Sequence, residues 1–195
     1  MKKVDLTQSG EGWLEWRQKG IGGSDAYTIM EDTHWISPEE LLQVKLGKKK
    51  VVENAAMSRG KRLEPIARQA YMDLTGIQVV PVCVISDQYP WMRASLDGLS
   101  LDGEIVLEIK CPNDYAHKQA LDGFYPRYYR AQLQHELLVT QAKLLHYFSY
   151  TDSLKYTLKD RFALVPVQPD LDYWPILLRR EREFYERMMG EPSHP

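Results

Sequence analysis

One alternating segment, EIVLEIK from Glu104 to Lys110, constrains the fold of this chain more than any other feature of its sequence. In an extended strand, successive side chains point to opposite faces of a sheet. The two isoleucines and the leucine at the odd-numbered positions therefore share a face that belongs in a core, while Glu108 and Lys110 project together from the other face. We expect a β-strand that presents an acid and a base two residues apart.

The segment from Tyr89 to Asp97 also alternates and predicts a second strand just before the first. Asp97 is expected to end this strand in front of Gly98, on the same face as Ser95. A hairpin between the two strands would bring Asp97 beside Glu108, so the sequence predicts two carboxylates at one point of a sheet.

Two converging carboxylates repel each other unless a cation lies between them. Oxygen ligands without nitrogen or sulfur favour Mg²⁺, with Mn²⁺ as a substitute. Beside such an ion, Lys110 can orient a metal-bound water or stabilise the negative charge that develops at a phosphate. A surface salt bridge between Glu108 and Lys110 is the alternative, and an E-x-K pair taken alone favours it.

The remaining patterns place these two strands in a mixed sheet flanked by helices, an α/β fold. No internal repeat or Pro/Gly/Ser linker divides the chain, so we expect a single domain over residues 1–195. Capping and termination residues mark two helices clearly. The expected elements are a helix between Ser37 and Gly47, a helix from about Ala55 or Arg62 to Thr75 that stops at Gly76, a strand over Ile77–Ile85 with Pro81 at an edge or a bulge, helices near Tyr115–Leu121 and Tyr128–Thr140, strands near Leu144–Tyr150 and Arg161–Val167, and a closing helix near Leu171–Met189.

The charge balance argues against a protein that coats DNA without regard to sequence, because such proteins neutralise many phosphates. The net charge is −2 and the sequence contains two cysteines, which we expect to be reduced thiols. No apolar segment of membrane length or signal-peptide type occurs, so we expect a cytoplasmic protein. Positive charge that contacts DNA must be local, and residues 45–50, 58–62 and 125–130 are the candidate patches.

Other catalytic signatures are incomplete. His135-Glu136 begins like a zinc-protease helix, but Val139 stands where the second histidine is required. There is no P-loop for ATP. The glycines at positions 20, 22 and 23 predict a flexible turn that delivers Ser24 to a helix N-terminus, which suits a phosphate.

Four blocks in this order resemble the PD-(D/E)xK nucleases, and in particular the lambda-exonuclease-like, or YqaJ-type, viral recombinase nucleases that include phage alkaline exonucleases. Together the blocks cover most of residues 12–150. They are WLEWRQKGIGGSDA (Trp13 to Ala26), RGKRLEPIARQAY (Arg59 to Tyr71), SLDG with LEIKCP (Ser95 to Pro112), and AQLQHELLVT (Ala131 to Thr140).

The resemblance implies a set of active-site residues. Asp97 and Glu108 match the metal-binding carboxylates, with the backbone carbonyl of Ile109 as a third ligand, and Lys110 matches the catalytic lysine. Two further catalytic residues are implied from helices, Glu64 before the sheet and Gln134 after the catalytic strand.

It also implies a site for a 5′-terminal phosphate made by Arg17, Ser24 and Ser95. Arg130, one helical turn before Gln134, is expected to face the active site and contact DNA. Two expectations near the N-terminus remain open. Met57 is either a wedge that splits base pairs or an ordinary core or linker methionine, and for Trp13 and Trp16 we favour packing of an amphipathic helix on the core.

The implied activity is a Mg²⁺-dependent, processive 5′-to-3′ exonuclease that acts on double-stranded DNA ends, releases mononucleotides and leaves a 3′ overhang. The resemblance further implies a ring-shaped homotrimer and a phage single-strand annealing protein as partner. An endonuclease with the same core, cutting internally or at branched structures, is the alternative among enzymes. A DNA-end-binding module without catalysis is the alternative outside them.

Overall fold

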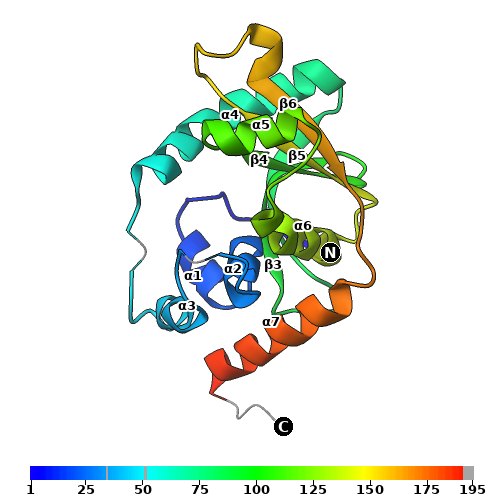
Figure 1. Ribbon diagram of the computed structural model, residues 1–195. Helices are drawn as coiled ribbons and strands as arrows, with labels where there is room; N and C mark the ends of the chain where they lie inside the picture. Colours follow the sequence, from blue (N-terminus) through cyan, green and yellow to red (C-terminus); the bar gives the residue numbers. More distant parts are fainter. Residues whose placement is uncertain (34, 51, 191–195) are drawn as a thin grey trace.

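A six-stranded mixed sheet organises the chain (Figure 1). The structure is a computed structural model that describes residues 1–33, 35–50 and 52–190. Within these described ranges the strands follow one another in the sheet in chain order, and β4 and β5 are the only neighbours that run parallel. They are β1 (Lys2–Val4), β2 (Val79–Ile85), β3 (Arg93–Ser100), β4 (Ile105–Lys110), β5 (Leu144–Tyr150) and β6 (Phe162–Val167).

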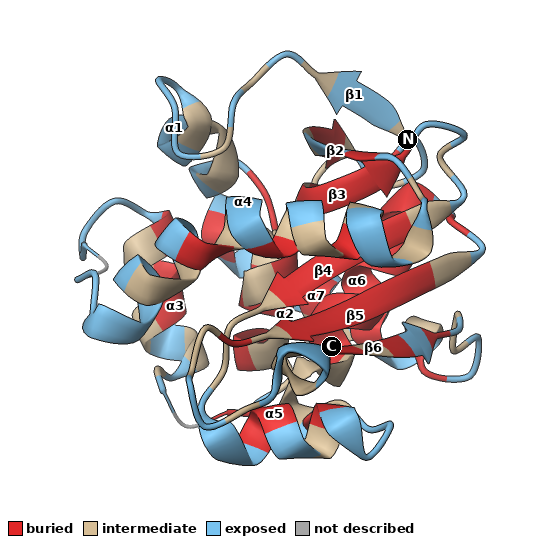
Figure 2. Cartoon of the chain, turned by 90° about the horizontal axis from the view of Figure 1, so that it is seen from above, coloured by how far each residue is buried: buried red, intermediate tan, exposed pale blue. Residues whose placement is uncertain are grey.

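Helices cover both faces of this sheet. On one face, α4 (Ala55–Thr75) packs Ala67 and Tyr71 against Leu107 of β4. On the other face, α6 (Arg130–Thr140) packs against the strand residues that include Val106. Seen from above, β3, β4 and β5 are buried along most of their length (Figure 2). Side chains on either face of β4 are therefore removed from bulk water.

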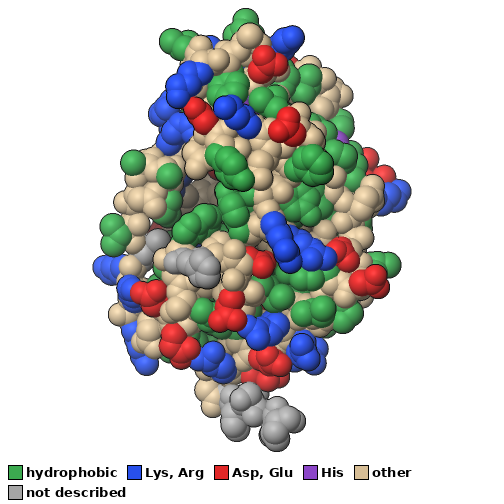
Figure 3. Space-filling model, in the orientation of Figure 1, with side chains coloured by type: hydrophobic (Ala, Val, Ile, Leu, Met, Phe, Trp, Pro, Cys, Tyr) green, Lys and Arg blue, Asp and Glu red, His purple; other side chains and the backbone are tan. Residues whose placement is uncertain are grey.

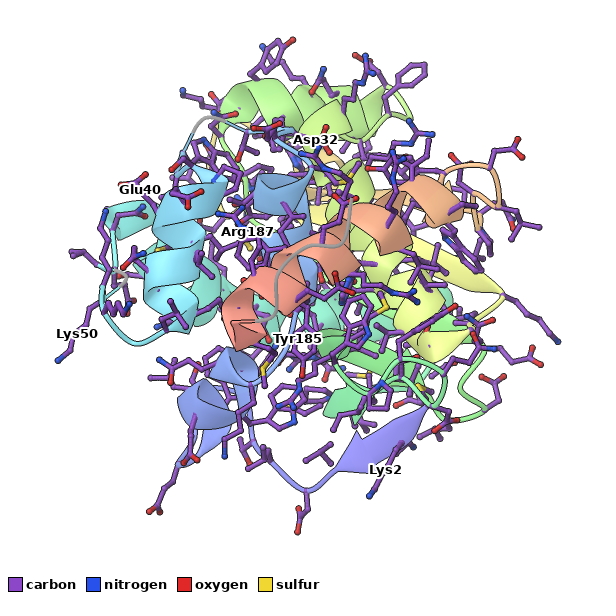
Figure 4. The ribbon with its side chains drawn as sticks, turned by 90° about the horizontal axis from the view of Figure 1, so that it is seen from below. Lys2, Asp32, Glu40, Lys50, Tyr185 and Arg187 are labelled. Carbon is purple, nitrogen blue, oxygen red and sulfur yellow. The ribbon has the colours of Figure 1, made fainter. Side chains whose placement is uncertain are left out.

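Helices α2 (Gly23–Ile29) and α7 (Trp174–Met189) pack against the far side of α6, and α3 (Pro38–Lys45) packs on these two helices. The short helix α1 (Trp13–Gln18) precedes α2 and has no buried residue. Seen from below, α7 crosses the molecule to α3, where Arg187 lies (Figure 4) and donates to Glu39 at 2.6 Å. The buried His135 of α6 contacts Glu181 of α7 at 2.8 Å. These contacts fix α6 between two layers.

The predicted α/β fold and most predicted elements are confirmed. Ser37 and Glu40 form the expected capping box of α3, and Gly76 ends α4 with a φ of 73°. Helix α5 (Asp114–Leu121) lies close to its predicted position. The helix predicted near Tyr128–Thr140 consists of the 3₁₀ turn η1 (Arg127–Tyr129) followed by α6. A second 3₁₀ turn, η2 (Leu158–Arg161), precedes β6. Across the described residues, no helix is long and apolar enough to span a membrane.

Two predictions of detail are wrong. The strand predicted over Tyr89–Asp97 is β3, which begins at Arg93 rather than Tyr89. It does not end at Asp97 but continues through Gly98 to Ser100. The helix α1 does not pack tryptophans into the core, since none of its residues, all of them described, is buried. Strand β1 was not predicted, because its three residues are too few to show a pattern.

Candidate active site

A bulge in β3 sets the position of Asp97. The register between β2 and β3 shifts between Val80 and Val82, so that two residues of β3, Asp97 and Gly98, lie opposite Pro81. Proline has no N–H to donate to a neighbouring strand, and a bulge changes the direction in which the affected side chain points. The bulge predicted at Pro81 is confirmed, and its extra residue belongs to β3, where it reorients the candidate carboxylate.

Strands β3 and β4 separate at this bulge. Their pairing extends over Leu99↔Val106 and Gly98↔Leu107 and goes no further along the described strands. Beyond it, the Asp97 carboxylate accepts the N–H of Ile109 at 2.8 Å, which satisfies a backbone donor that lacks a strand partner. A Cβ at Gly98 would lie 3.0 Å from that of Val79 and 3.1 Å from that of Leu107, so a side chain there would force these neighbours to shift. The fork between the strands therefore holds Asp97 against β4.

Glu108 and Lys110 form a network with a side chain from α6. The ammonium of Lys110 lies 2.6 Å from Oε1 of Glu108 and donates to Oε1 of Gln132 at 3.1 Å. The Gln132 amide in turn donates to Glu108 at 2.6 Å and to Glu136 at 3.0 Å. The Lys110 ammonium also lies 4.8 Å from the centre of the Tyr129 ring. Every polar group of Gln132 is thus committed to the two β4 side chains or to Glu136.

A third acid approaches from the opposite face of the sheet. Glu64 in α4 forms an ion pair with Arg68 one turn later, and Arg68 also donates to the backbone carbonyl of Asp97 at 2.6 Å. Arg68 therefore ties α4 to the bulge. Burial and the negative charge of Glu108 raise the pKa of Glu64, although Arg68 opposes that shift.

The electrostatics of the fork favour a bound cation. Burial, followed by the charges of Glu108 and Glu64, holds the pKa of Asp97 well above its ordinary value. Burial would lower the pKa of Lys110, but Glu108 and Asp97 hold it well above its usual range, so this side chain is an ammonium at neutral pH. One ammonium does not neutralise the nearby carboxylates, and the remaining negative potential favours a divalent ion.

A separate polar cluster lies at the N-terminal end of α2. Arg17 donates to Oγ of Ser24 at 2.6 Å, and its guanidinium lies 4.8 Å from the centre of the Trp13 ring. The indole of Trp13 donates to Oγ of Ser95 at 2.9 Å. The structure thus brings together the three residues predicted for phosphate binding and adds Trp13, which links two of them.

The cluster is supported by a buried ion pair. Lys45, in α3, contacts the Asp25 carboxylate and donates to the carbonyl oxygens of Arg17 at 2.9 Å and Gly20 at 2.8 Å. Lys45 is 8% exposed, so this member of the first candidate basic patch does not contribute to a DNA-binding surface. Burial works to raise the pKa of Asp25, but Lys45 and Arg17 together hold it below its ordinary value.

Comparison with known proteins decides the family. The sequence profile of the YqaJ-like viral recombinase domain matches residues 12–143. The chain belongs to this family. The uncharacterized protein YqaJ of Bacillus subtilis strain 168 is 32% identical over 133 residues, which are 66% of this chain and 42% of that protein. The chain therefore matches less than half the length of that relative.

Solved structures agree with this assignment. The alkaline exonuclease LHK-Exo in complex with dAMP superimposes with a TM-score of 0.79 and 25% identity over 93% of each chain. A structure of the same exonuclease from Laribacter hongkongensis gives a TM-score of 0.77 at 24% identity, with 93% of each chain covered. A phage related exonuclease from Haemophilus somnus 129PT shares the fold, with a TM-score of 0.66 and 13% identity, over 92% of this chain and 99% of the other. Family membership and the likeness to LHK-Exo support a nuclease role and place the YqaJ-like chain among the lambda-exonuclease-like PD-(D/E)xK proteins.

The fork residues fit a hard divalent ion. Within the described ranges, no three His, Cys, Asp or Glu side chains form a complete metal-binding group. The predicted ligand set needs only two carboxylates, Asp97 and Glu108, with the carbonyl oxygen of Ile109 and water, and such oxygen-only sets suit Mg²⁺. The role of Ile109 stays a prediction.

The prediction that Gln134 lies at the active site is not supported by its position. Gln134 donates to the carbonyl of Gln168 at 2.9 Å and accepts from the amide of Asp170 at 2.8 Å and the indole of Trp174 at 2.9 Å. Arg130 shares this face of α6 and pairs with Asp170 at 2.5 Å. The two residues do face the same way, as predicted, but they contact the segment before α7 and the first residue of that helix rather than the fork.

Gln132 and Glu136 occupy the position expected for Gln134. They lie two residues away along α6, which is about 200° around a helix, so they face β4. Both were missed by sequence reasoning. Oε2 of Glu136 is buried without a hydrogen-bond partner among the described residues, and burial together with Glu108 holds the pKa of Glu136 well above its ordinary value. The helical spacing of Gln132 and Glu136 was the available signal.

Met57 lies apart from these clusters, in the first turn of α4, and is 41% exposed. An exposed side chain at the start of a helix is compatible with a wedge that splits base pairs, and this role of Met57 stays a prediction. Arg59, in the second candidate basic patch, is instead bonded to Cys111, Pro112 and Asp152 and so fixes the segment after β4.

Proposed function

We propose that this protein is a divalent-metal-dependent deoxyribonuclease that degrades one strand of duplex DNA from its 5′ end. The observation that carries the proposal is the fork between β3 and β4, which holds Asp97 and Glu108 beside the ammonium of Lys110. Carboxylates that can hold a metal next to a fixed cation suit hydrolysis of a phosphodiester. A salt bridge with a purely structural role would need one acid beside Lys110, and it would not need the second and third acids that are placed here.

In this proposal Asp97, Glu108 and the carbonyl of Ile109 hold Mg²⁺, which when bound supplies Lewis-acid activation of water and of the scissile phosphate. Lys110 places a positive charge where negative charge develops on the phosphate oxygens. Gln132 keeps Lys110 and Glu108 oriented through its hydrogen bonds to both. Glu64 adds a carboxylate from the opposite face of the sheet.

The 5′ polarity is supported by the cluster at the start of α2. Arg17 supplies a guanidinium, and Ser24 lies in the first turn of a helix, where free backbone N–H groups and the helix dipole favour an anion. Ser95 is only two residues before Asp97 on β3. A terminal phosphate bound there would leave the adjoining phosphodiester close to the fork.

We extend the proposal to the assembly. Residues 1–195 act as one nuclease domain in a ring-shaped homotrimer around the duplex, which favours processive release of mononucleotides. A phage single-strand annealing protein receives the 3′ overhang. An acidic net charge of −2 is compatible with a ring whose basic residues face the channel.

The test uses linear duplexes labelled at either the 5′ or the 3′ end, a covalently closed circle, and the Asp97→Asn variant as a control for contaminating nucleases. With Mg²⁺, early release of 5′-labelled mononucleotide with an intact circle is expected, and EDTA or Asp97→Asn abolishes it. Cutting of the circle would instead establish an endonuclease. Binding to DNA ends without any product would establish a binding module.

A further inference from the structure

Trp35 is an unusually large apolar side chain to leave in solvent. It lies between α2 and α3 and is 61% exposed. Its ring makes edge contacts with Tyr27 of α2 and with Tyr128 of η1, with both pairs of ring centroids 5.4 Å apart. Edge-to-face contacts of this kind fix the orientation of an aromatic ring. The indole is therefore held in place while much of its surface stays available.

These contacts extend in a row from Trp35 to the candidate active site. The rings of Tyr128 and Tyr129 lie 4.5 Å apart, and the Tyr129 ring lies 4.8 Å from the Lys110 ammonium. We call Trp35, Tyr128 and Tyr129 the aromatic row. Trp35 is exposed to solvent at one end of the row, and Tyr129 at the other end contacts Lys110 of the fork.

The row also adjoins the cluster at the start of α2. Tyr27 follows Ser24 by three residues, so the two side chains share a face of the helix. Burial raises the pKa of the Tyr27 hydroxyl, and the positive charges of both Lys110 and Arg17 oppose that shift, which agrees with a place between the fork and the Arg17 cluster. A nucleotide bound between these two clusters would have aromatic rings beside it.

Positive charge lies beside the row, and the molecule is hollowed on the face that Figure 3 shows. The space-filling view is hollowed between the part of the molecule that carries α4 and the part that carries α1 to α3, with hydrophobic side chains at its border (Figure 3). Arg127 directly precedes Tyr128. Burial raises the pKa of Asp32, and the positive charges of Arg127 and Arg130 oppose that shift, which indicates that both arginines lie near Asp32. Aromatic rings beside arginine are a typical combination for single-stranded nucleic acid.

We propose that Trp35, supported by Tyr128, stacks on the unpaired base of the 5′-terminal nucleotide of the strand being cut. This inference rests on the proposed function. Stacking on an aromatic ring accepts every base, because each base has a π face, so it suits a nuclease that must remove nucleotides of any sequence. The stacked base would hold the terminal nucleotide across the fork while its phosphate lies at the Arg17 cluster.

The test places the fluorescent base 2-aminopurine at the 5′ terminus, at the fifth nucleotide, or at the 3′ terminus of the complementary strand. Fluorescence and affinity are measured in EDTA, where no strand is cut. The variants are Trp35→Ala, Trp35→Phe and Tyr115→Ala, the last removing an aromatic side chain that is 73% exposed and lies outside the row.

Only the 5′-terminal probe should be quenched by the wild-type protein. Trp35→Ala should lose this quenching and weaken end binding by roughly 5- to 150-fold, the range typical of one stacked base, whereas Trp35→Phe and Tyr115→Ala should retain both. Unchanged quenching in Trp35→Ala would overturn the inference, and so would quenching of the complementary strand alone. If the wild-type protein neither binds nor cuts DNA ends, the proposed function fails, and that outcome is distinct from a defect confined to Trp35.

Discussion

Two glutamines of α6 offer a matched pair for separating catalysis from stability. Gln132 and Gln134 lie two residues apart, are 5% and 2% exposed, and each makes three hydrogen bonds through its side chain. Gln132 bonds to the side chains of Lys110, Glu108 and Glu136, whereas Gln134 bonds to the segment before α7 and to Trp174 at its start. Replacing each by leucine keeps the approximate volume and removes the hydrogen bonds.

Gln132→Leu should act mainly on the rate. A hydrogen bond to a charged group contributes about 1.5–3 kcal/mol, and about 1.36 kcal/mol corresponds to a tenfold change in rate. Loss of the bond that orients Lys110 should therefore lower kcat by roughly 10- to 150-fold. Gln132→Glu, which keeps an acceptor for Lys110 but loses the donor to Glu108, should not restore the rate, because it adds a further carboxylate to the fork.

Gln134→Leu should act mainly on stability. Three neutral hydrogen bonds at about 1 kcal/mol each give a loss of about 3 kcal/mol, which for a chain of this size lowers the Tm by roughly 6–12 °C. The assay measures single-turnover cleavage of a 5′-labelled duplex well below either Tm, with thermal unfolding alongside. Equal loss of turnover in the two variants, or loss confined to Gln134→Leu, would refute the assignment of Gln132 to the site.

Three other substitutions test the remaining parts of the site. Lys110→Ala should bind DNA ends in EDTA with near wild-type affinity yet lose about 10²-fold or more in turnover with Mg²⁺, since it removes a charge that stabilises the transition state; wild-type-like cleavage would remove Lys110 from catalysis. Removing the 5′-phosphate from a linear duplex should slow initiation, and Arg17→Ala should abolish the difference between phosphorylated and dephosphorylated ends; an undiminished difference in that variant would place the phosphate elsewhere. Asp25→Asn leaves Lys45 buried without its counter-ion and should cost about 3–5 kcal/mol at pH 7. Because the folded-state pKa of Asp25 is lowered, its contribution is present above the unfolded value of about 3.9 and is lost as the pH falls through the folded value, so the Tm of the wild type and the variant should converge only in acid.

The sequence predicted the fold where single residues mark the ends of elements. Ser37 caps α3 and Gly76 terminates α4, and both effects are local to the chain. Pro81 indicated an irregular register, but which strand carries the extra residue depends on the neighbour of β2, and a single strand pattern does not contain that information. The end of β3 was misplaced for this reason, since its bulge interrupts the alternation at Asp97.

The site was predictable in its strands and not in its helix. Glu108 and Lys110 share a face because β4 is extended, so their proximity follows from spacing alone. In α6, every residue from Ala131 to Thr140 is buried, and a helix without an exposed face gives no hydrophobic period by which to orient it. Choosing between Gln132 and Gln134 therefore required the positions of β4 and α7, which only the folded chain provides.

The burial of every α6 residue from Ala131 to Thr140 has a consequence for motion. A helix fixed between the sheet on one side and α2 and α7 on the other opens only when one of these layers detaches, so its amides should exchange with deuterium among the slowest in the protein. Helix α1, at the periphery of the site, has no buried residue and should exchange much faster. We expect substrate ends to enter and products to leave through local opening of such peripheral segments, while the geometry of the fork persists from one turnover to the next.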